Sequence, residues 1–361
     1  MRGIVKAGAG KGLEFRTDLP IPVPGDDEVL MKIRCASICG TDLGIYDWGP
    51  WAQKRIKTFP RTIGHETTGE IVEVGKNVKD RFAGQRVSVE THIWDGTCPH
   101  CRAGNRHICQ HMTLYGIQTD GAFAEYSTVR ADATYVLDDT LTDEQGCIFE
   151  PMGSGVHGVE EAEVAGKTVL VAGCGAIGLT VVAACHVFGA KQIIACDLFD
   201  EKLAVAKKMG ADIVVNSRKQ DLVSTVLDLT DGLGVEAAID VTGSPASLNA
   251  SLKSVMAGGR LVSVGLPGEP VTMDMTEDLF YRQISLSGFC GRRIWETWDD
   301  FTKVMKDPIY DMDQVIGGKF RLEDYEEGFA RMRSGAPGKM FLYPCSELYN
   351  AVRDIKSQNK L

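Results

Sequence analysis

The chain has 361 residues, of which 44% are hydrophobic and 24% are charged, and its formal net charge is −10 at pH 7. A chain of this length is too long to fold around one ordinary hydrophobic core, so two domains are expected. The composition is typical of a globular enzyme. A negative net charge argues against nucleic acid as a partner, because binding to phosphates requires a basic face.

Residues 1 to about 150 contain short β-like runs that Gly and Pro interrupt, such as 28–33, 68–74 and 86–89, and show no long helical period. From about residue 153, buried strands are expected at 169–172, 192–196, 212–215, 237–241 and 261–264. Helical stretches near 176–188, 200–209, 219–229 and 245–257 separate them. This alternation predicts an α/β domain with a parallel sheet and helices on both faces.

After about residue 290 the pattern becomes helical, at 295–305 and 322–332, and ends in a strand-like run at 340–343. We expect this tail to return to the first domain. The predicted domains are therefore residues 1–152 with 291–361, and residues 153–290.

The chain is not expected to enter a membrane or to be secreted. Residues 1–7 contain no apolar core of signal-peptide length. Residues 169–190 are almost free of charge, but glycines divide them into a β-rich half and a helical half, so a buried strand-turn-helix is favoured over a membrane span. We expect a cytoplasmic protein with no membrane partner.

The 11 cysteines do not form the pattern of a disulfide framework, because eight of them are scattered among apolar residues. The other three are Cys98, Cys101 and Cys109, which lie in one short segment. Together with Asp95 their spacing is x2, x2, x7, which is typical of a closed structural zinc site in a reducing compartment. A carboxylate is a harder ligand than a thiolate and should hold the ion less tightly.

Two alternatives stay open for this segment. The histidines nearby, His100, His107 and His111, could replace Asp95 as a ligand, or the site could be partly empty. The segment could also be a loop of reduced cysteines that binds no metal.

A second set of possible ligands is dispersed along the first 150 residues. Cys39, His65, Glu66 and Glu150 offer a thiolate, an imidazole and carboxylates, which suit a catalytic zinc ion that keeps one position open for water or substrate. Glu150 precedes Pro151 where the β-rich part ends, and such a junction would form a cleft wall. Each residue taken singly is more often structural than a ligand.

The sequence from Gly173 to Gly178 follows a predicted strand and opens a predicted helix, and it has the form G-x-G-x-x-G. Gly173 permits a tight turn, Gly175 lets the backbone approach a pyrophosphate, and Gly178 lets the helix pack on the strand. The free N–H groups of the helix then face the phosphates. A structural turn or a methyltransferase loop are the alternatives to a dinucleotide site.

Asp197 ends the next predicted strand, 19 residues after Gly178. Its carboxylate would accept hydrogen bonds from the adenosine ribose and repel a 2′-phosphate, which favours NAD over NADP. Ile177 lies inside the glycine turn, and Lys202 lies close enough after Asp197 to meet a phosphate. A Lewis-acid metal beside a hydride carrier implies oxidation of an alcohol or reduction of a carbonyl.

The motif Gly64-His65-Glu66-x2-Gly69-x5-Gly75-x2-Val78 matches the zinc motif of the medium-chain alcohol dehydrogenases at every fixed position, and the chain resembles that family over nearly its whole length. Within the family it is similar to the L-threonine 3-dehydrogenases and to the polyol (sorbitol-type) dehydrogenases. The segments that carry this similarity are 38–48, 291–298, 332–335 and 338–339.

The resemblance implies a GroES-like catalytic domain, a Rossmann domain, a cleft between them and a homo-oligomer, either a dimer or a tetramer. It implies that Cys39, His65 and Glu150 hold the catalytic zinc, and that Glu66 binds it directly or exchanges with water.

Other roles follow from the same resemblance. Arg292 falls in a motif whose arginine lies near the cofactor phosphates. Thr41 would pass on the proton of the alcohol. His92 aligns with a position near the substrate pocket, although a loop histidine that faces solvent is the alternative.

The chain departs from the threonine dehydrogenases at two positions. Gly44 stands where they usually have a histidine that ends the proton relay, and Asp95 stands where they usually have the first structural cysteine. Both departures weaken threonine as the substrate more than they weaken the reaction class.

The sequence therefore predicts a zinc- and NAD-dependent dehydrogenase that oxidises a secondary alcohol of a small polar substrate, such as a polyol or a sugar acid, to the ketone. L-threonine is the alternative substrate. A zinc-free quinone reductase is a weaker rival, because it would not need Cys39, His65 and Glu150. A non-catalytic protein that senses NAD is the rival from another class.

Overall fold

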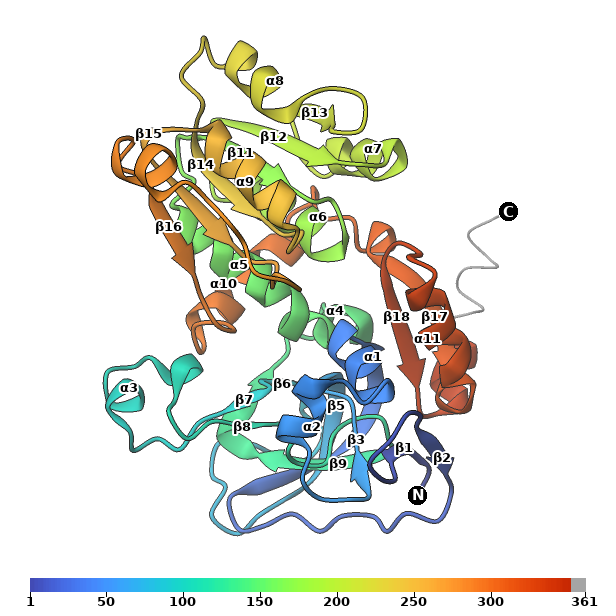
Figure 1. Ribbon diagram of the computed structural model, residues 1–361. Coiled ribbons are helices and arrows are strands. Elements are labelled where there is room, and N and C mark those ends of the chain that lie inside the picture. The colour runs from blue at the N-terminus through green and yellow to red at the C-terminus, as the bar shows by residue number, and fades with distance from the viewer. Residues whose placement is uncertain (352–361) are drawn as a thin grey trace. The chain divides into compact units, whose positions relative to one another are not determined.

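The computed structural model describes residues 1–351, and these form two compact units (Figure 1). Unit 1 contains Met1–Pro151 and the described residues from Ile316 onward, and unit 2 contains Met152–Val315. The sequence analysis assigned residues 291–315 to the first domain, whereas here they belong to unit 2. The reason is that helix α10 (Glu296–Lys306) packs against α6 (Ala176–Val187).

Unit 1 is built around the long strand β3 (Glu28–Ile38). β3 pairs with β5, β9 and β18, all antiparallel, in a seven-stranded sheet of order β10-β6-β5-β3-β18-β17, with β9 joined to β3 beside this path. The strand that comes from the end of the described chain, β18 (Lys339–Tyr343), pairs through Met340 with Ile38 and brings this segment back to unit 1. The other strands of unit 1 are β1 (Gly3–Lys6), β2 (Glu14–Arg16), β4 (Arg61–Thr62), β5 (Glu66–Val74), β6 (Arg86–Val89), β7 (His92–Ile93), β8 (Thr113–Leu114), β9 (Tyr126–Arg130), β10 (Thr134–Val136) and β17 (Ile316–Arg321).

The helices before residue 148 are short, in agreement with the expectation that this region has no long helical period. The longest, α1, has seven residues. These helices are α1 (Gly40–Tyr46), α2 (Pro50–Arg55), α3 (Pro99–Arg102) and α4 (Asp143–Cys147); later in unit 1 follows α11 (Tyr325–Arg333). α5 (Phe149–Ala162) begins in unit 1 and continues in unit 2.

Unit 2 contains a six-stranded sheet in which every pairing is parallel, and this confirms the predicted α/β class. Its order, β13-β12-β11-β14-β15-β16, places β11 at the point where the winding reverses, which is where doubly wound sheets bind ligands. Five of these strands were predicted from the sequence. β16 was not predicted, because its two serines and its glycine do not form the apolar run that marks a buried strand. The strands are β11 (Thr168–Ala172), β12 (Gln192–Asp197), β13 (Ile213–Asn216), β14 (Val235–Asp240), β15 (Val255–Ser263) and β16 (Ser285–Gly288).

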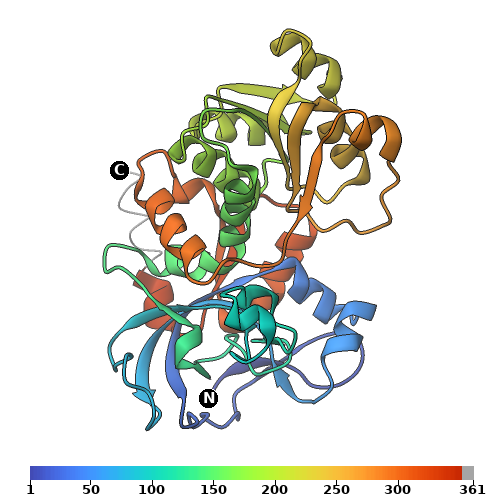
Figure 2. The same ribbon diagram turned by 90° about the vertical axis from the view of Figure 1, so that its left-hand side faces the viewer.

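Helices cover both sides of this sheet, as Figure 2 shows. α6 contacts α7, and α8 contacts α9, so that the helices form two pairs. Each helix contacts the strands beside it, and helices on both faces explain why the strands are apolar throughout. The remaining helices of unit 2 are α7 (Asp200–Lys208), α8 (Leu222–Leu229) and α9 (Pro245–Ser254).

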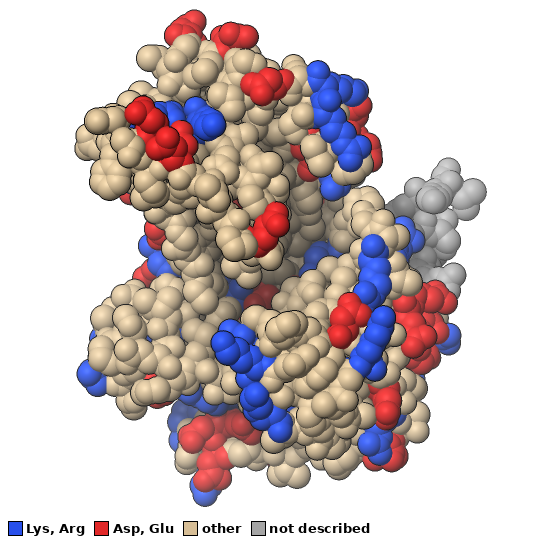
Figure 3. Space-filling model, viewed as in Figure 1, with Lys and Arg blue, Asp and Glu red and all other residues tan. Residues whose placement is uncertain are grey.

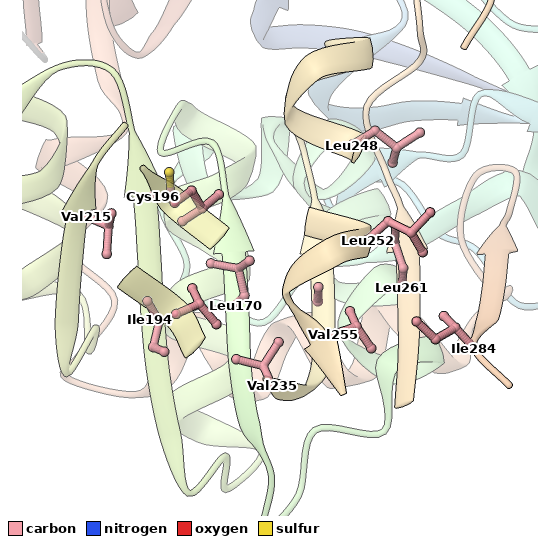
Figure 4. Packing of buried hydrophobic residues seen from close by; sticks show 13 residues of the cluster. Leu170, Ile194, Cys196, Val215, Val235, Leu248, Leu252, Val255, Leu261 and Ile284 are labelled. Carbon is pink, nitrogen blue, oxygen red and sulfur yellow. The ribbon is translucent and has the colours of Figure 1, made fainter. Parts of the chain in front are cut away.

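Side chains from strands and helices together form the core of unit 2 (Figure 4). Leu170 and Ile194 come from adjacent strands, and Leu248 and Leu252 come from α9. All four side chains are buried, and this packing makes the end of β11 a rigid support for the turn that follows it.

The described residues contain no helix that is long and apolar enough to cross a membrane. Residues 169–190 instead form β11, a glycine turn and the twelve-residue helix α6. On the face shown in Figure 3, basic and acidic side chains are interspersed, and neither sign covers a broad continuous area.

Candidate metal centres and dinucleotide site

The pairing of two strands brings together residues that lie far apart in the sequence. Ser37, near the end of β3, pairs with Glu66, the first residue of β5. Cys39 follows β3 directly and His65 precedes β5 directly, so both lie at the same end of the strand pair. One ligand atom from each of Cys39, His65 and Glu66 lies within 4.8 Å of the others.

These three side chains fit a zinc ion. His65 and Glu66 are buried, and Oε1 of Glu66 is a buried atom without a hydrogen-bond partner. Leaving such atoms unpaired costs free energy, and a metal ion would remove that cost. A thiolate, an imidazole and a carboxylate are ligands that zinc prefers.

Asp42 is a part of this site that the sequence analysis missed. Its buried carboxylate accepts a hydrogen bond from the backbone N–H of Cys39 at 2.8 Å, and its Oδ1 lies 3.5 Å from Nδ1 of His65. Asp42 therefore orients two of the three candidate ligands, as carboxylates beside metal-binding histidines commonly do. The sequence did contain a signal for this role: an acidic residue three positions after Cys39, at the start of α1, is placed to accept a hydrogen bond from the Cys39 backbone.

Glu66 has two further partners that the sequence analysis did not name. Ser37 donates a hydrogen bond to its Oε2, and Nζ of Lys339 lies 2.6 Å from the same oxygen. Lys339 also donates to the carbonyl oxygen of Ile38 at 2.9 Å. Burial by itself lowers the pKa of Lys339, but the Glu66 carboxylate and the nearby Cys39 together outweigh it and hold that pKa above its ordinary value. Because Ser37 and Lys339 both contact Oε2, Oε1 is the oxygen of Glu66 that remains available to bind a metal ion.

Three other predicted catalytic residues are also in unit 1. Thr41 lies in the first turn of α1, two residues after the candidate ligand Cys39. Glu150 is buried at the start of α5. Among residues 1–351, the close group of ligand atoms consists of Cys39, His65 and Glu66 and does not include Glu150. His92 is mostly buried, and its Nδ1 lies 2.8 Å from Oε1 of the fully buried Glu90, so the alternative of a solvent-facing loop histidine does not describe it.

The second candidate centre groups Asp95 with Cys98, Cys101 and Cys109, whose ligand atoms also lie within 4.8 Å of one another. Sγ of Cys98 lies 3.5 Å from that of Cys101 and 3.9 Å from that of Cys109. Three buried thiols at such distances, with a carboxylate beside them, fit a four-coordinate zinc ion.

The protein environment separates the proton affinities of these ligands. The backbone N–H of Cys101 lowers the pKa of the Cys98 thiol to about 7, whereas burial raises the pKa of the Cys101 thiol to about 12. A hydrogen bond from His111 lowers the pKa of Asp95. Neither His111 nor the other two histidines proposed as substitute ligands belong to the group of close ligand atoms in residues 1–351.

The glycine turn of unit 2 has the shape that its sequence predicts. Gly173 has a φ of +98°, which favours glycine, and a Cβ added to Gly178 would lie 1.8 Å from the carbonyl oxygen of Gly173. Gly175 is exposed at the N-cap of α6, and a Cβ there would meet no atom within 4 Å. The turn therefore packs tightly inward and leaves the N-terminus of α6 open, which fits a pyrophosphate group.

Asp197 ends β12 beside this turn, and its Oδ2 accepts a hydrogen bond from the N–H of Cys174 at 2.8 Å. Lys202 lies on α7, with its ammonium group 5.0 Å from the centre of the Phe199 ring. The carboxylate thus lies at the carboxyl end of the sheet, where a ribose bound to the turn would be.

Two other predicted cofactor residues are on neighbouring elements of unit 2. Ile177 is half-buried in the first turn of α6, and its side chain occupies the space beside Gly155. Arg292 is buried and packs its aliphatic carbons against Gly153, where an added Cβ would lie 2.6 Å from one of them.

Models of two known protein families match this chain. The model of the family described as "Alcohol dehydrogenase GroES-like domain" matches residues 25–139, and that of the family described as "Zinc-binding dehydrogenase" matches residues 176–307. The chain is 40% identical to an L-threonine 3-dehydrogenase of Bacillus velezensis over 95% of this chain and 99% of the relative. It is 39% identical to an L-threonine 3-dehydrogenase of Pyrococcus horikoshii over 94% and 97% of the two chains.

Solved structures show the same fold. The 2R,3R-butanediol dehydrogenase of Bacillus subtilis has a TM-score of 0.85 at 29% identity and covers 95% of this chain and 99% of its own. The galactitol-1-phosphate dehydrogenase of Escherichia coli has a TM-score of 0.87 at 24% identity, with 95% and 100% covered. These matches confirm the predicted GroES-like and Rossmann fold class, and the chain belongs to the zinc-binding, medium-chain alcohol dehydrogenase family.

Proposed function

We propose that this protein oxidises a secondary alcohol of a small polar substrate to the ketone and that NAD accepts the hydride. The observation that carries the proposal is the close group of Cys39 with the buried His65 and Glu66, in which Oε1 of Glu66 has no hydrogen-bond partner, in a chain that also contains a dinucleotide turn. A zinc ion bound there supplies Lewis acidity, which lowers the pKa of an alcohol.

The protein residues have distinct roles in this proposal. Cys39 and His65 bind the ion, and Asp42 orients both through its contacts with the Cys39 N–H and His65. Glu150 is the further candidate ligand. Lys339 and Ser37 hold one oxygen of Glu66, which leaves the other oxygen to bind or to exchange with water.

Proton and substrate handling follow from neighbouring residues. Thr41 accepts the proton of the substrate alcohol at its hydroxyl oxygen, and its place two residues after Cys39, at the start of α1, supports this role. His92, held by Glu90, is a candidate to orient the substrate.

NAD is the proposed cofactor. Gly173, Gly175 and Gly178 form the turn for its pyrophosphate, and Asp197 accepts hydrogen bonds from its adenosine ribose. Arg292 is the candidate to meet a cofactor phosphate. The three clustered thiols of the second centre support a reducing compartment such as the cytoplasm, where they stay available to a structural zinc ion.

Two substrate classes compete, and each has an observation in its favour. Gly44, in place of the histidine usual in threonine dehydrogenases, favours a polyol or a sugar acid. The named relatives at 39 to 40% identity favour L-threonine. Formation of NADH with L-threonine, other amino alcohols, tetritols, pentitols, hexitols and sugar acids separates the two. Bound zinc and NAD without turnover of any alcohol would instead support a non-catalytic NAD sensor.

We further propose that the chain forms a homo-oligomer through the outer edge of β16. This strand ends the sheet, and Leu286 on it is exposed. Leu266, which follows β15, and Phe280 and Tyr281, which precede β16, are 89%, 74% and 78% exposed. An unpaired sheet edge offers its backbone groups for pairing with a second chain, and the exposed apolar side chains beside this edge would be buried by such pairing. Light scattering should give a mass above one chain, and Leu286→Lys should lower it.

A further inference from the structure

The carboxylate of Asp95 takes the place of a thiolate in the hydrogen bonds of its loop. Its Oδ1 accepts the N–H groups of Thr97 at 2.9 Å and Cys98 at 3.1 Å, two and three residues later. The thiols show the same pattern, because Sγ of Cys98 accepts the N–H of Cys101 at 3.5 Å and Sγ of Cys109 accepts that of His111 at 3.3 Å. Oδ1 of Asp95 therefore has the orientation of a ligand atom, and it lies 3.4 Å from Sγ of Cys109.

The second oxygen of Asp95 is turned to other partners. Oδ2 accepts a hydrogen bond from the hydroxyl of Thr97 at 2.9 Å and lies 2.5 Å from Nδ1 of His111. His111 comes two residues after Cys109, so one side chain links the first and the last ligand of the loop. Because Thr97 and His111 both contact Oδ2, Asp95 presents only Oδ1 to the three thiols of Cys98, Cys101 and Cys109.

We propose that His111 is a positioning residue of this metal site: its Nδ1–H holds Oδ2 of Asp95 so that only Oδ1 faces the thiols of Cys98, Cys101 and Cys109. The inference rests on the proposed structural zinc site and adds to it a residue outside the ligand set. A carboxylate can rotate and can bind through either oxygen, whereas a thiolate has one sulfur atom. The substitution of Asp for Cys therefore creates a need for a partner that fixes the orientation.

The test compares zinc affinity among variants of the full chain in a Cys39→Ser background, so that the first centre contributes little metal. A chromophoric chelator competes for zinc, and the ultraviolet thiolate-to-metal band of the cadmium-substituted protein reports the three thiols. Loss of a second-sphere partner typically weakens metal binding by about 10- to 100-fold, and we expect a loss of that size for His111→Ala. His111→Asn, which keeps a side-chain N–H near the position of Nδ1, should recover part of it.

His100→Ala is the matched control, because His100 lies in the same segment, on α3 between Cys98 and Cys101, and is not one of the residues whose ligand atoms group around the thiols. It should leave the zinc affinity and the cadmium band unchanged. If His111→Ala keeps its affinity within about twofold while Cys101→Ser loses zinc, the metal site stands and the positioning role is wrong. If Cys101→Ser also keeps its zinc, both the metal site and the role of His111 are overturned.

Discussion

The ammonium group of Lys339 lies 2.6 Å from Oε2 of Glu66, and both side chains are buried. The two residues come from the two separate chain segments of unit 1, on β18 and β5, which both flank β3. The ion pair therefore joins the returning end of the described chain to the strand that carries a candidate zinc ligand.

Removing the cation should destabilise unit 1. Lys339→Met leaves the Glu66 carboxylate buried without its cation, and breaking a buried ion pair in this way costs about 3–5 kcal/mol. Urea unfolding should show this loss. Lys339→Met combined with Glu66→Gln should recover much of the stability, because no buried charge is left. A single variant as stable as the original protein would contradict the importance of the pair.

Substitution of the first metal centre should remove turnover but not the fold. We expect that Cys39→Ser or His65→Ala abolishes NADH formation and leaves NAD affinity nearly unchanged, because unit 2 has its own core. NADH absorbance and NAD titration measure the two properties on the same sample. Near-normal turnover in either variant would show that these residues do not hold a catalytic ion.

The second metal centre should serve stability. Metal analysis of protein purified without chelators should approach about two zinc ions per chain, one for each centre. Cys101→Ser should lower the melting temperature before it lowers the rate per folded molecule, since a structural ion contributes folding free energy. Asp95→Cys should tighten the site. A metal content that stays near one ion per chain would mean that this centre is vestigial.

Asp197 should control the choice of cofactor. Loss of two hydrogen bonds to the ribose and repulsion of a 2′-phosphate should cost NADP several kcal/mol, or on the order of a hundredfold in catalytic efficiency. Asp197→Ser should narrow this gap, because Lys202 on the next helix can then meet the phosphate. Equal efficiency of the unmodified protein with NAD and NADP would falsify the role given to Asp197.

Gly44 should set an alkaline optimum for oxidation. A histidine accepts a proton near its ordinary pKa of about 6.5, whereas glycine cannot, so the proton must leave through Thr41 and water, which higher pH favours. Gly44→His should raise the oxidation rate more at about pH 7 than at about pH 9.

The backbone at Gly44 allows this test. The residue lies in α1, and a Cβ added to it would meet no atom within 4 Å, so the structure gives no sign that glycine relieves strain there. Gly44→Ala is the control, since it adds a side chain without a proton acceptor. A rate that falls equally at every pH in Gly44→His would mean that the histidine only disturbs α1.

Local patterns in the sequence predicted the sheet of unit 2, the glycine turn and the segment of the second metal centre. The alternation of buried strands and helices predicted the sheet of unit 2, because each element has its own period of apolar residues. Gly173 and Gly178 were recognisable because positive φ and close backbone contact exclude other residues. The spacing from Asp95 to Cys109 was recognisable because the four ligands lie within one loop.

The arrangement of distant residues was decided only by tertiary structure. Cys39 reaches His65 because Ser37 pairs with Glu66, and a one-residue change in that register would turn the Glu66 side chain to the other face of the sheet. The position of α10 against α6 moved residues 291–315 to unit 2. Lys339 meets Glu66 through the pairing of β18 with β3. These contacts depend on register and packing between segments far apart in the chain, and neither leaves a periodic pattern in the sequence.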